Sequence, residues 1–172
     1  MDHTNLTYKN VECLTQDILR QMNQDSWIPD YVVGITRGGL LPAILISQYL
    51  DVPMETLKVS LRDDRSEPEH NLWMPKDAAN GKKILIVDDI NDSGDTLNWI
   101  RKDWESSVAS ADWLTIWGMY LHGVNSGNVR VAVLIDNLAS KSQLTINYAG
   151  MEINKNDDPR WVNFPYEGWW KK

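Results

Sequence analysis

The segment from Ile84 to Thr96 constrains the fold of this chain more than any other part of it. It opens with four consecutive aliphatic residues over 84–87, and such a run is typical of a strand buried on both faces of a parallel sheet. Two adjacent carboxylates, Asp88 and Asp89, follow this strand. Because open α/β sheets bind ligands at the carboxyl ends of their strands, the segment predicts a parallel sheet with a binding site at this point.

The residues after the acidic pair have the composition of an anion-binding loop. Asp92-Ser93-Gly94-Asp95-Thr96 is small and polar, and it precedes a predicted helix over 96–104. Unpaired N–H groups at a helix N-terminus favour phosphate and other anions. We therefore expect a phosphate-binding loop here, whereas an Asp-Asp pair taken alone would indicate only a solvated acidic turn.

The rest of the chain predicts alternating strands and helices. Apolar spacing predicts a helix after Thr7 and another over 40–50, and apolar runs predict strands over 31–35, 56–61 and 129–135. This alternation predicts an α/β fold with a mainly parallel sheet flanked by helices. The polar connection over 62–83 lacks a clear period. The tryptophan-rich segment 106–127 fits a continued helix and a short hairpin equally well.

Composition and charge narrow the class of protein. The 172 residues, 42% of them hydrophobic, fit one domain over 1–172. A net charge of −7 without a long basic run argues against nucleic acid or an anionic membrane as a partner. The lone Cys13 and a polar start without an apolar signal region predict a cytoplasmic protein. The longest apolar-rich stretch, 40–50, is too short to span a bilayer.

The acid pair, the third acid and the small-residue loop together resemble the ribose-phosphate motif of the type I phosphoribosyltransferases. The resemblance implies that Asp88 and Asp89 accept hydrogen bonds from the ribose hydroxyls of phosphoribosyl pyrophosphate (PRPP) and lie near a bound Mg²⁺. It implies that Asp92 manages the N7 proton of an incoming purine and that residues 92–96 hold the 5′-phosphate. The charge of Asp95 would repel phosphate, so we expect its side chain to point outward.

Two further stretches resemble parts of the same family. Thr36-Arg37-Gly38-Gly39 is similar to its pyrophosphate loop, in which glycines let N–H groups approach an anion and Arg37 adds donors. The resemblance implies a cis or strained peptide bond between Thr36 and Arg37. Residues 62–75 occupy the place of the family's mobile loop. Its candidate charged residues, each equally consistent with a solvated surface loop, are Arg62, Arg65 and His70.

The C-terminal residues 137–172 resemble the hood that covers the base in the purine phosphoribosyltransferases, and the xanthine–guanine and hypoxanthine–guanine enzymes are the most similar. Segments 147–153 and 161–167 carry this resemblance. It implies that Trp161 stacks on the purine and that the backbone of Val162 reads the edge of the ring. Ile90 is a further candidate for the base site.

The chain departs from the guanine-type enzymes at one position. Those enzymes carry a lysine just after the fourth strand, which donates to the purine 6-oxo group, but this chain has Asp136 and Asn137 there. Lys141 would restore a 6-oxo preference if it folded back, whereas Asp136 or Asn137 would accept a hydrogen bond from a 6-amino group. A site built for one hydrogen-bonding edge rejects the other, so both alternatives stay open.

The resemblance implies an enzyme of purine salvage. It would be a Mg²⁺-dependent glycosyltransferase that moves the phosphoribosyl group from PRPP to a purine and releases pyrophosphate. Its partners would be these two substrates and further copies of the chain, which would form a dimer or tetramer. It would bind neither nucleic acid nor a membrane. The alternatives are a PRPP-sensing regulator on the same fold and a transferase with a non-purine acceptor.

Overall fold

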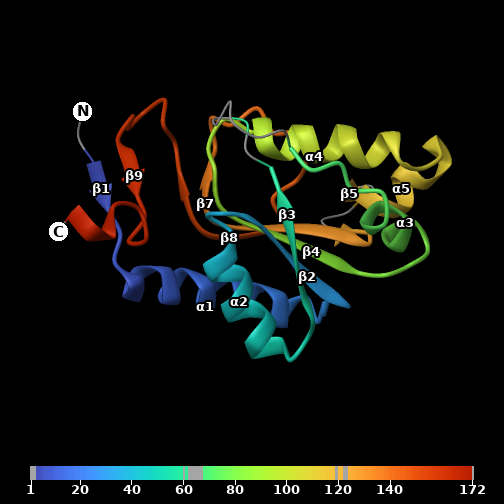
Figure 1. The fold of residues 1–172 in the computed structure, drawn as a ribbon, viewed down its shortest axis with the longest axis horizontal. Coiled ribbons are helices and arrows are strands. Elements are labelled where there is room, and N and C mark those ends of the chain that lie inside the picture. Colours follow the sequence, from blue (N-terminus) through green and yellow to red (C-terminus); the bar gives the residue numbers. More distant parts are fainter. Residues whose placement is uncertain (1–2, 60, 62–67, 119, 122–123, 172) are drawn as a thin grey trace.

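The computed structural model describes residues 3–59, 61, 68–118, 120–121 and 124–171. Its centre is a sheet of five strands in the order β3-β2-β4-β7-β8, and every neighbouring pair is parallel (Figure 1). The mainly parallel sheet predicted from the sequence is therefore confirmed. Its strands are β2 (Tyr31–Thr36), β3 (Met54–Lys58), β4 (Ile84–Asn91), β7 (Val129–Asn137) and β8 (Tyr148–Ile153).

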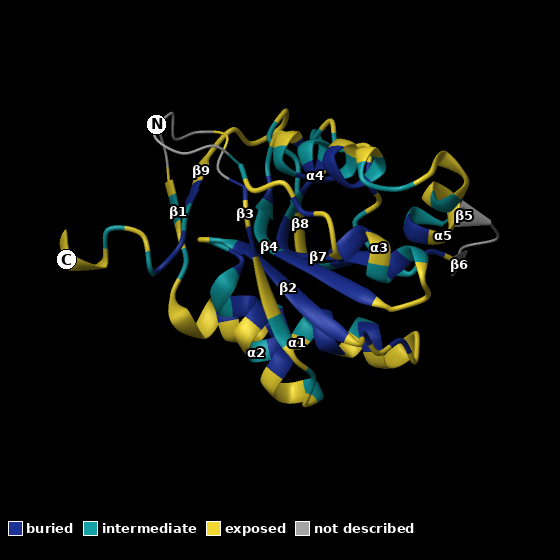
Figure 2. Ribbon diagram, turned by 45° about the vertical axis from the view of Figure 1, so that its right-hand side comes forward, coloured by how far each residue is buried: buried dark blue, intermediate teal, exposed yellow. Residues whose placement is uncertain are grey.

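Helices cover both faces of this sheet. One face carries α1 (Tyr8–Gln24) and α2 (Leu40–Leu50). The other face carries α3 (Met74–Ala79), α4 (Asp95–Ser106) and α5 (Trp113–Trp117), as Figure 1 shows. Because both faces are covered, the first four residues of β4 are buried, and burial concentrates in the central strands (Figure 2). The aliphatic run that predicted a doubly buried strand is explained by this arrangement.

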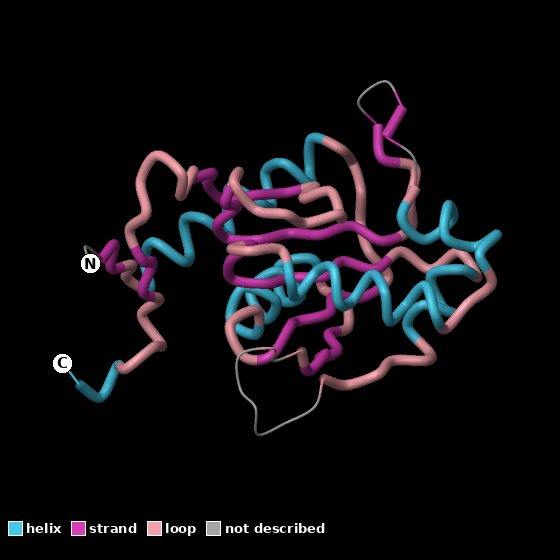
Figure 3. The backbone as a smooth tube through the Cα atoms, turned by 90° about the horizontal axis from the view of Figure 1, so that it is seen from above, coloured by secondary structure: helices cyan, strands magenta, loops and turns pink. Residues whose placement is uncertain are grey.

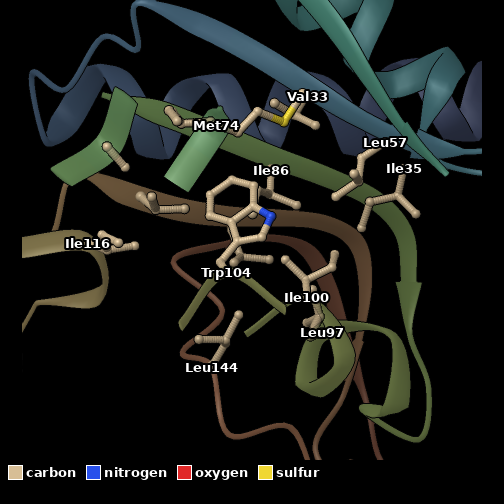
Figure 4. Packing of buried hydrophobic residues seen from close by; sticks show 14 of the residues in the cluster. Val33, Ile35, Leu57, Met74, Ile86, Leu97, Ile100, Trp104, Ile116 and Leu144 are labelled. Carbon is tan, nitrogen blue, oxygen red and sulfur yellow. The ribbon is translucent and has the colours of Figure 1, made fainter. Parts of the chain in front are cut away.

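On one face of the sheet, side chains from three helices and from the strands pack around Trp104, which is fully buried (Figure 4). Met74 comes from α3, Leu97 lies about two helical turns before Trp104 on α4, and Ile116 comes from α5. Each buried aliphatic side chain of this size stabilises the fold by about 1.5–3 kcal/mol relative to an exposed one. Trp104 also stacks on Trp117 with ring centroids 5.7 Å apart. The tryptophan-rich segment thus contributes to the core.

Three elements differ from the sequence expectations. The polar connection contains the short helix α3, which begins where Asn71 Oδ1 accepts the N–H groups of Trp73 and Met74. Strand β3 lies earlier than expected because it pairs with β2 from Met54 to Lys58. The tryptophan-rich segment does not continue α4, which ends at Ser106. It contains a 3-10 turn η1 (Ser110–Asp112), the separate short helix α5, and then the antiparallel strands β5 (Tyr120–Leu121) and β6 (Val124–Asn125), which agree with the hairpin alternative.

The two ends of the chain meet at one end of the molecule. Strand β1 (His3–Asn5) pairs in parallel with β9 (Trp161–Asn163), and a 3-10 turn η2 (Trp169–Lys171) follows. Figure 3 shows both termini on the same side. The predicted helix after Thr7 is confirmed as α1, and Thr7 caps it through a reciprocal pair of hydrogen bonds with Asn10. Among the described residues, no helix has the length and apolarity that a membrane span requires.

Candidate active site

The acidic pair Asp88–Asp89 lies in the last half of β4, at the carboxyl edge of the sheet. Asp88 Oδ1 accepts the N–H of Asp89 at 2.9 Å, and Asp89 Oδ1 accepts the N–H of Ile90 at 2.8 Å. The hydroxyl of Tyr166, from the C-terminal segment, donates to Asp89 Oδ2 at 2.9 Å. One backbone N–H and one distant hydroxyl therefore fix the orientation of the Asp89 carboxylate.

Asp89 and Tyr166 change each other's protonation. Burial raises the pKa of the Asp89 carboxyl above its ordinary value of 3.8, and the hydrogen bond from Tyr166 acts in the opposite direction. Burial also raises the pKa of the Tyr166 phenol, and the nearby Asp89 carboxylate raises it further. Tyr166 consequently keeps its proton near neutral pH and acts as a donor. Its single hydrogen serves either Asp89 or the carbonyl of Gly38, whose oxygen is 3.2 Å away.

The predicted pyrophosphate loop follows β2 and reaches the same carboxylate. The peptide bond between Thr36 and Arg37 is cis, which confirms the expectation drawn from the resemblance. A Cβ atom added to Gly38 would lie only 2.0 Å from Asp89 Oδ2, so the glycine allows the loop to touch Asp89. A Cβ atom on Gly39 would lie 2.2 Å from the carbonyl oxygen of Val87. Both glycines are required by close approach to β4 and its acids.

The predicted phosphate loop connects β4 to α4, as the sequence indicated. Gly94 adopts a φ of +92°, which L side chains rarely adopt, and precedes Asp95 at the start of the helix. Ser93 Oγ donates to Asp95 Oδ2 at 2.8 Å, and Asp95 is exposed. Thr96 lies in the first turn of α4. The loop therefore has the small residues and the helix N-terminus that anion binding requires.

Asp92, the third acid, forms an ion pair that the sequence did not suggest. Lys155 Nζ lies 2.7 Å from Asp92 Oδ1, and both side chains are largely buried. Asn137 connects the two backbones, because its amide donates to the carbonyl of Asp92 at 2.9 Å and accepts the N–H of Lys155 at 3.0 Å. Lys155 stands in a polar Asn-Lys-Asn-Asp-Asp run that resembles a surface turn, so no local pattern marks it.

A pocket lies between the carboxyl end of β4 and the C-terminal segment. We call it the Trp161 pocket, and it is lined by Asp89, Ile90, Asp92, Lys155, Trp161, Val162, Phe164 and Glu167. Trp161 is 39% exposed, whereas Val162 is buried. Parallel pairing with β1 holds both residues in β9. The predicted base residues Ile90, Trp161 and Val162 therefore lie together, beside the predicted catalytic Asp92.

The other three predicted base residues make different contacts. Asp136 Oδ1 accepts from the side-chain amide of Asn91 at 2.7 Å. Asn137 is buried in the bridge described above. The N–H of Lys141 donates to the carbonyl of Ser93 at 2.9 Å, which places its backbone behind the phosphate loop. Of the described residues that line the Trp161 pocket, none is Asp136, Asn137 or Lys141.

The predicted mobile loop is only partly described. Arg62 and Arg65 lie outside the described residues. His70 Nδ1 lies 2.6 Å from Asp103 Oδ1 of α4, and its ring packs against Trp99 with centroids 5.5 Å apart. Asp103 also accepts the N–H of Asn71 at 3.0 Å. His70 therefore belongs to an anchor between this segment and α4.

The donor set at the acidic pair fits a hard divalent cation that is shared with a ligand. Asp88 and Asp89 supply carboxylate oxygens, which Mg²⁺ prefers, and the cation usually retains waters and binds substrate phosphates as well. In the described parts of the chain, no group of three or more His, Cys, Asp or Glu side chains forms a complete metal site. The residues therefore fit Mg²⁺ bound through two carboxylates and oxygens of a substrate.

Comparisons with known proteins agree with this arrangement. Xanthine phosphoribosyltransferase 1 of Saccharomyces cerevisiae is 27% identical over 127 residues, which cover 60% of this chain and 61% of that protein. Xanthine-guanine phosphoribosyltransferase of Cereibacter sphaeroides is 43% identical over 74 residues, which cover 41% of this chain and 44% of that protein. The matches thus span less than two thirds of either curated relative.

A solved structure shows the same fold over nearly the whole chain. The crystal structure of purine phosphoribosyltransferase from Pyrococcus horikoshii covers 97% of this chain and 95% of its own, with a TM-score of 0.66 and 22% identity. The family model described as the phosphoribosyl transferase domain matches residues 3–102, which include the predicted pyrophosphate loop, the acidic pair and the predicted phosphate loop. The chain therefore belongs to the phosphoribosyl transferase domain family.

Proposed function

We propose that this chain is a Mg²⁺-dependent purine phosphoribosyltransferase, which converts PRPP and a purine into a nucleoside 5′-monophosphate and pyrophosphate. The observation that carries the proposal is the meeting of three distant segments at Asp89. Gly38 of the predicted pyrophosphate loop packs against its carboxylate, and Tyr166 of the C-terminal segment donates to it. The similarity to xanthine and xanthine-guanine phosphoribosyltransferases supports a purine as the acceptor.

The elements around this point supply a site for each part of PRPP. Asp88 and Asp89 would accept hydrogen bonds from the ribose hydroxyls, because charged acceptors make the stronger bonds. Residues 92–96 would hold the 5′-phosphate at the N-terminus of α4. Residues 36–39 would hold the pyrophosphate, with Arg37 exposed toward solvent as an additional donor. Asp88 and Asp89 would hold the Mg²⁺, which would supply positive charge to stabilise the leaving pyrophosphate.

The reaction would take place between the ribose site and the Trp161 pocket. N9 of the purine forms a bond to C1′ of the ribose, while the bond from C1′ to pyrophosphate breaks and pyrophosphate leaves with the electron pair. Asp92 receives the proton that leaves N7. Trp161 and Val162 hold the ring and exclude water from the oxocarbenium-like transition state. In this scheme residues 137–172 act as the hood of a single domain, and family resemblance favours a cytoplasmic dimer or tetramer.

The proposal is tested by product formation. The protein is incubated with PRPP, Mg²⁺ and, separately, adenine, guanine, hypoxanthine, xanthine, uracil and orotate, and each product is identified by mass. We expect a nucleoside monophosphate with at least one purine and none with the pyrimidines. Asp92→Asn serves as the control, because it should bind the same substrates but form product much more slowly. Binding of PRPP without any product would instead support a sensor, and a product with a pyrimidine alone would overturn the choice of acceptor.

A further inference from the structure

Lys155 is the one basic residue among the described residues that line the Trp161 pocket. Its side chain is 17% exposed, so its charge is directed into the pocket region and away from bulk solvent. Nζ lies 5.0 Å from the centroid of the Trp161 ring, over its face. A flat ligand that stacks on this face would displace the ammonium group, which would then lie at the edge of the ligand.

The position of Lys155 is fixed from two sides. The ammonium of Lys155 pairs with Asp92 Oδ1 at 2.7 Å, and the backbone N–H of Lys155 donates to the buried amide oxygen of Asn137 at 3.0 Å. Asn137 donates to the Asp92 carbonyl, so one side chain sets the spacing of Lys155 and Asp92. An ammonium group has three N–H donors and no acceptor. It can therefore bond Asp92 and still donate to a ligand.

The order of these two groups matches one edge of a 6-oxo purine. N7 and the 6-substituent of a purine lie side by side on the same edge, and the 6-substituent is an acceptor carbonyl in guanine but a donor amino group in adenine. Asp92 is the residue proposed to face N7, and Lys155 lies next to it. An ammonium group that faces the purine 6-substituent would donate a hydrogen bond to a carbonyl oxygen. It would form no such bond with an amino group, because both groups are donors.

We propose that Lys155 determines base specificity by donating to the 6-oxo group of the purine, so that the site selects oxo-purines over 6-amino purines. This inference rests on the proposed function and assigns a role to a residue in the loop between β8 and β9. It also explains why the end of β7 carries Asp136 and Asn137. Those residues are used to hold Asn91, Asp92 and Lys155 in place. A purine that stacks on the Trp161 face moves the ammonium from the ring face to its own edge.

Binding of two nucleotides that differ at the purine 6-position tests the inference without requiring turnover. IMP carries a 6-oxo group and AMP a 6-amino group, while their ribose and phosphate contacts are shared. We expect the wild type to bind IMP about 10- to 100-fold more tightly than AMP, the range of one hydrogen bond to a charged group. Titration calorimetry gives both dissociation constants. In Lys155→Met the preference should fall to within about threefold, mainly through weaker binding of IMP.

Three variants complete the experiment. Lys155→Gln is the second variant if Lys155→Met does not fold, and it should also lose the preference because an amide donates or accepts by rotating. Lys102→Met makes the same change on the exposed face of α4 and should keep the preference. Lys141→Met tests the competing lysine and should also keep it.

The outcomes separate this inference from the function beneath it. If the wild type prefers IMP and the Lys155 variants keep that preference, or if Lys141→Met removes it, the assignment of Lys155 is wrong while nucleotide binding stands. Equal binding of IMP and AMP by the wild type also overturns it. If the wild type binds neither nucleotide, the proposed function fails and the inference falls with it.

Discussion

Replacing Gly38 with alanine tests whether the pyrophosphate loop is shaped by the acid of the neighbouring strand. A Cβ atom at this position would lie 2.0 Å from Asp89 Oδ2, 2.3 Å from Cγ and 2.7 Å from Oδ1. Real Cβ atoms essentially never approach below 3.0 Å, so the carboxylate must move by about 1 Å or more. Gly38 does not have a positive φ, so an alanine meets no conformational barrier of its own.

The size of the effect follows from what Asp89 loses when it moves. Its bonds from Tyr166 and from the N–H of Ile90 are 2.9 and 2.8 Å long and would stretch beyond hydrogen-bonding range. Overpacking usually costs about 1–3 kcal/mol, and a hydrogen bond to a charged group contributes about 1.5–3 kcal/mol. We expect Gly38→Ala to lower the free energy of unfolding by about 2–4 kcal/mol. In a chain of this size each kcal/mol corresponds to about 2–4 °C in Tm.

A double-mutant cycle identifies the cause. The three atoms nearest to the added Cβ all belong to the Asp89 carboxyl group, so Asp89→Ala removes every one of them. Urea unfolding, followed by tryptophan fluorescence, gives the free energies of the four proteins. Gly38→Ala should cost less than about 1 kcal/mol in the Asp89→Ala background, with a coupling of about 2 kcal/mol. An equal cost in both backgrounds would refute contact with Asp89 as the reason for the glycine.

Three further predictions follow from the site and the core. Asp92→Asn should lower kcat by about 10²–10⁴-fold and leave the Kd for PRPP within about threefold, measured by steady-state kinetics and calorimetry, and unchanged turnover would remove Asp92 from catalysis. Asp89→Asn should weaken PRPP binding but raise Tm at neutral pH. The pKa of Asp89 is raised in the folded state, so the wild type loses stability as pH rises through 3.8 toward that raised pKa, and the gain should vanish below about pH 3. A higher Tm of Asp89→Asn that persists below about pH 3 would contradict a raised pKa of Asp89 as its cause. Trp104→Ala should cost about 3–5 kcal/mol in urea unfolding, and a cost under about 1 kcal/mol would show that the core tolerates the cavity.

The sequence predicted those features whose cause is local. The aliphatic run of β4, the small residues of the phosphate loop and the Thr7 cap each carry their own pattern, and these elements formed where expected. Helix α3 was missed because a single side chain, Asn71, starts it inside a polar connection without a period. Tyr166 and Lys155 were missed as site residues because their partners, Asp89 and Asp92, lie far away along the chain. Parallel pairing with β1, from the other end of the chain, holds β9 in place, and no local pattern encodes that pairing.

A single-turnover reaction tests the central claim most directly. The protein is saturated with PRPP and Mg²⁺, mixed rapidly with a purine that gave product in the panel, and quenched at intervals to measure pyrophosphate and nucleotide together. In the wild type we expect pyrophosphate and nucleotide to appear at the same rate and in a one-to-one ratio. In Asp92→Asn we expect the same final amounts, formed at least about a hundredfold more slowly. Release of pyrophosphate without nucleotide, at a rate that is independent of the purine, would contradict phosphoribosyl transfer as the function of this site.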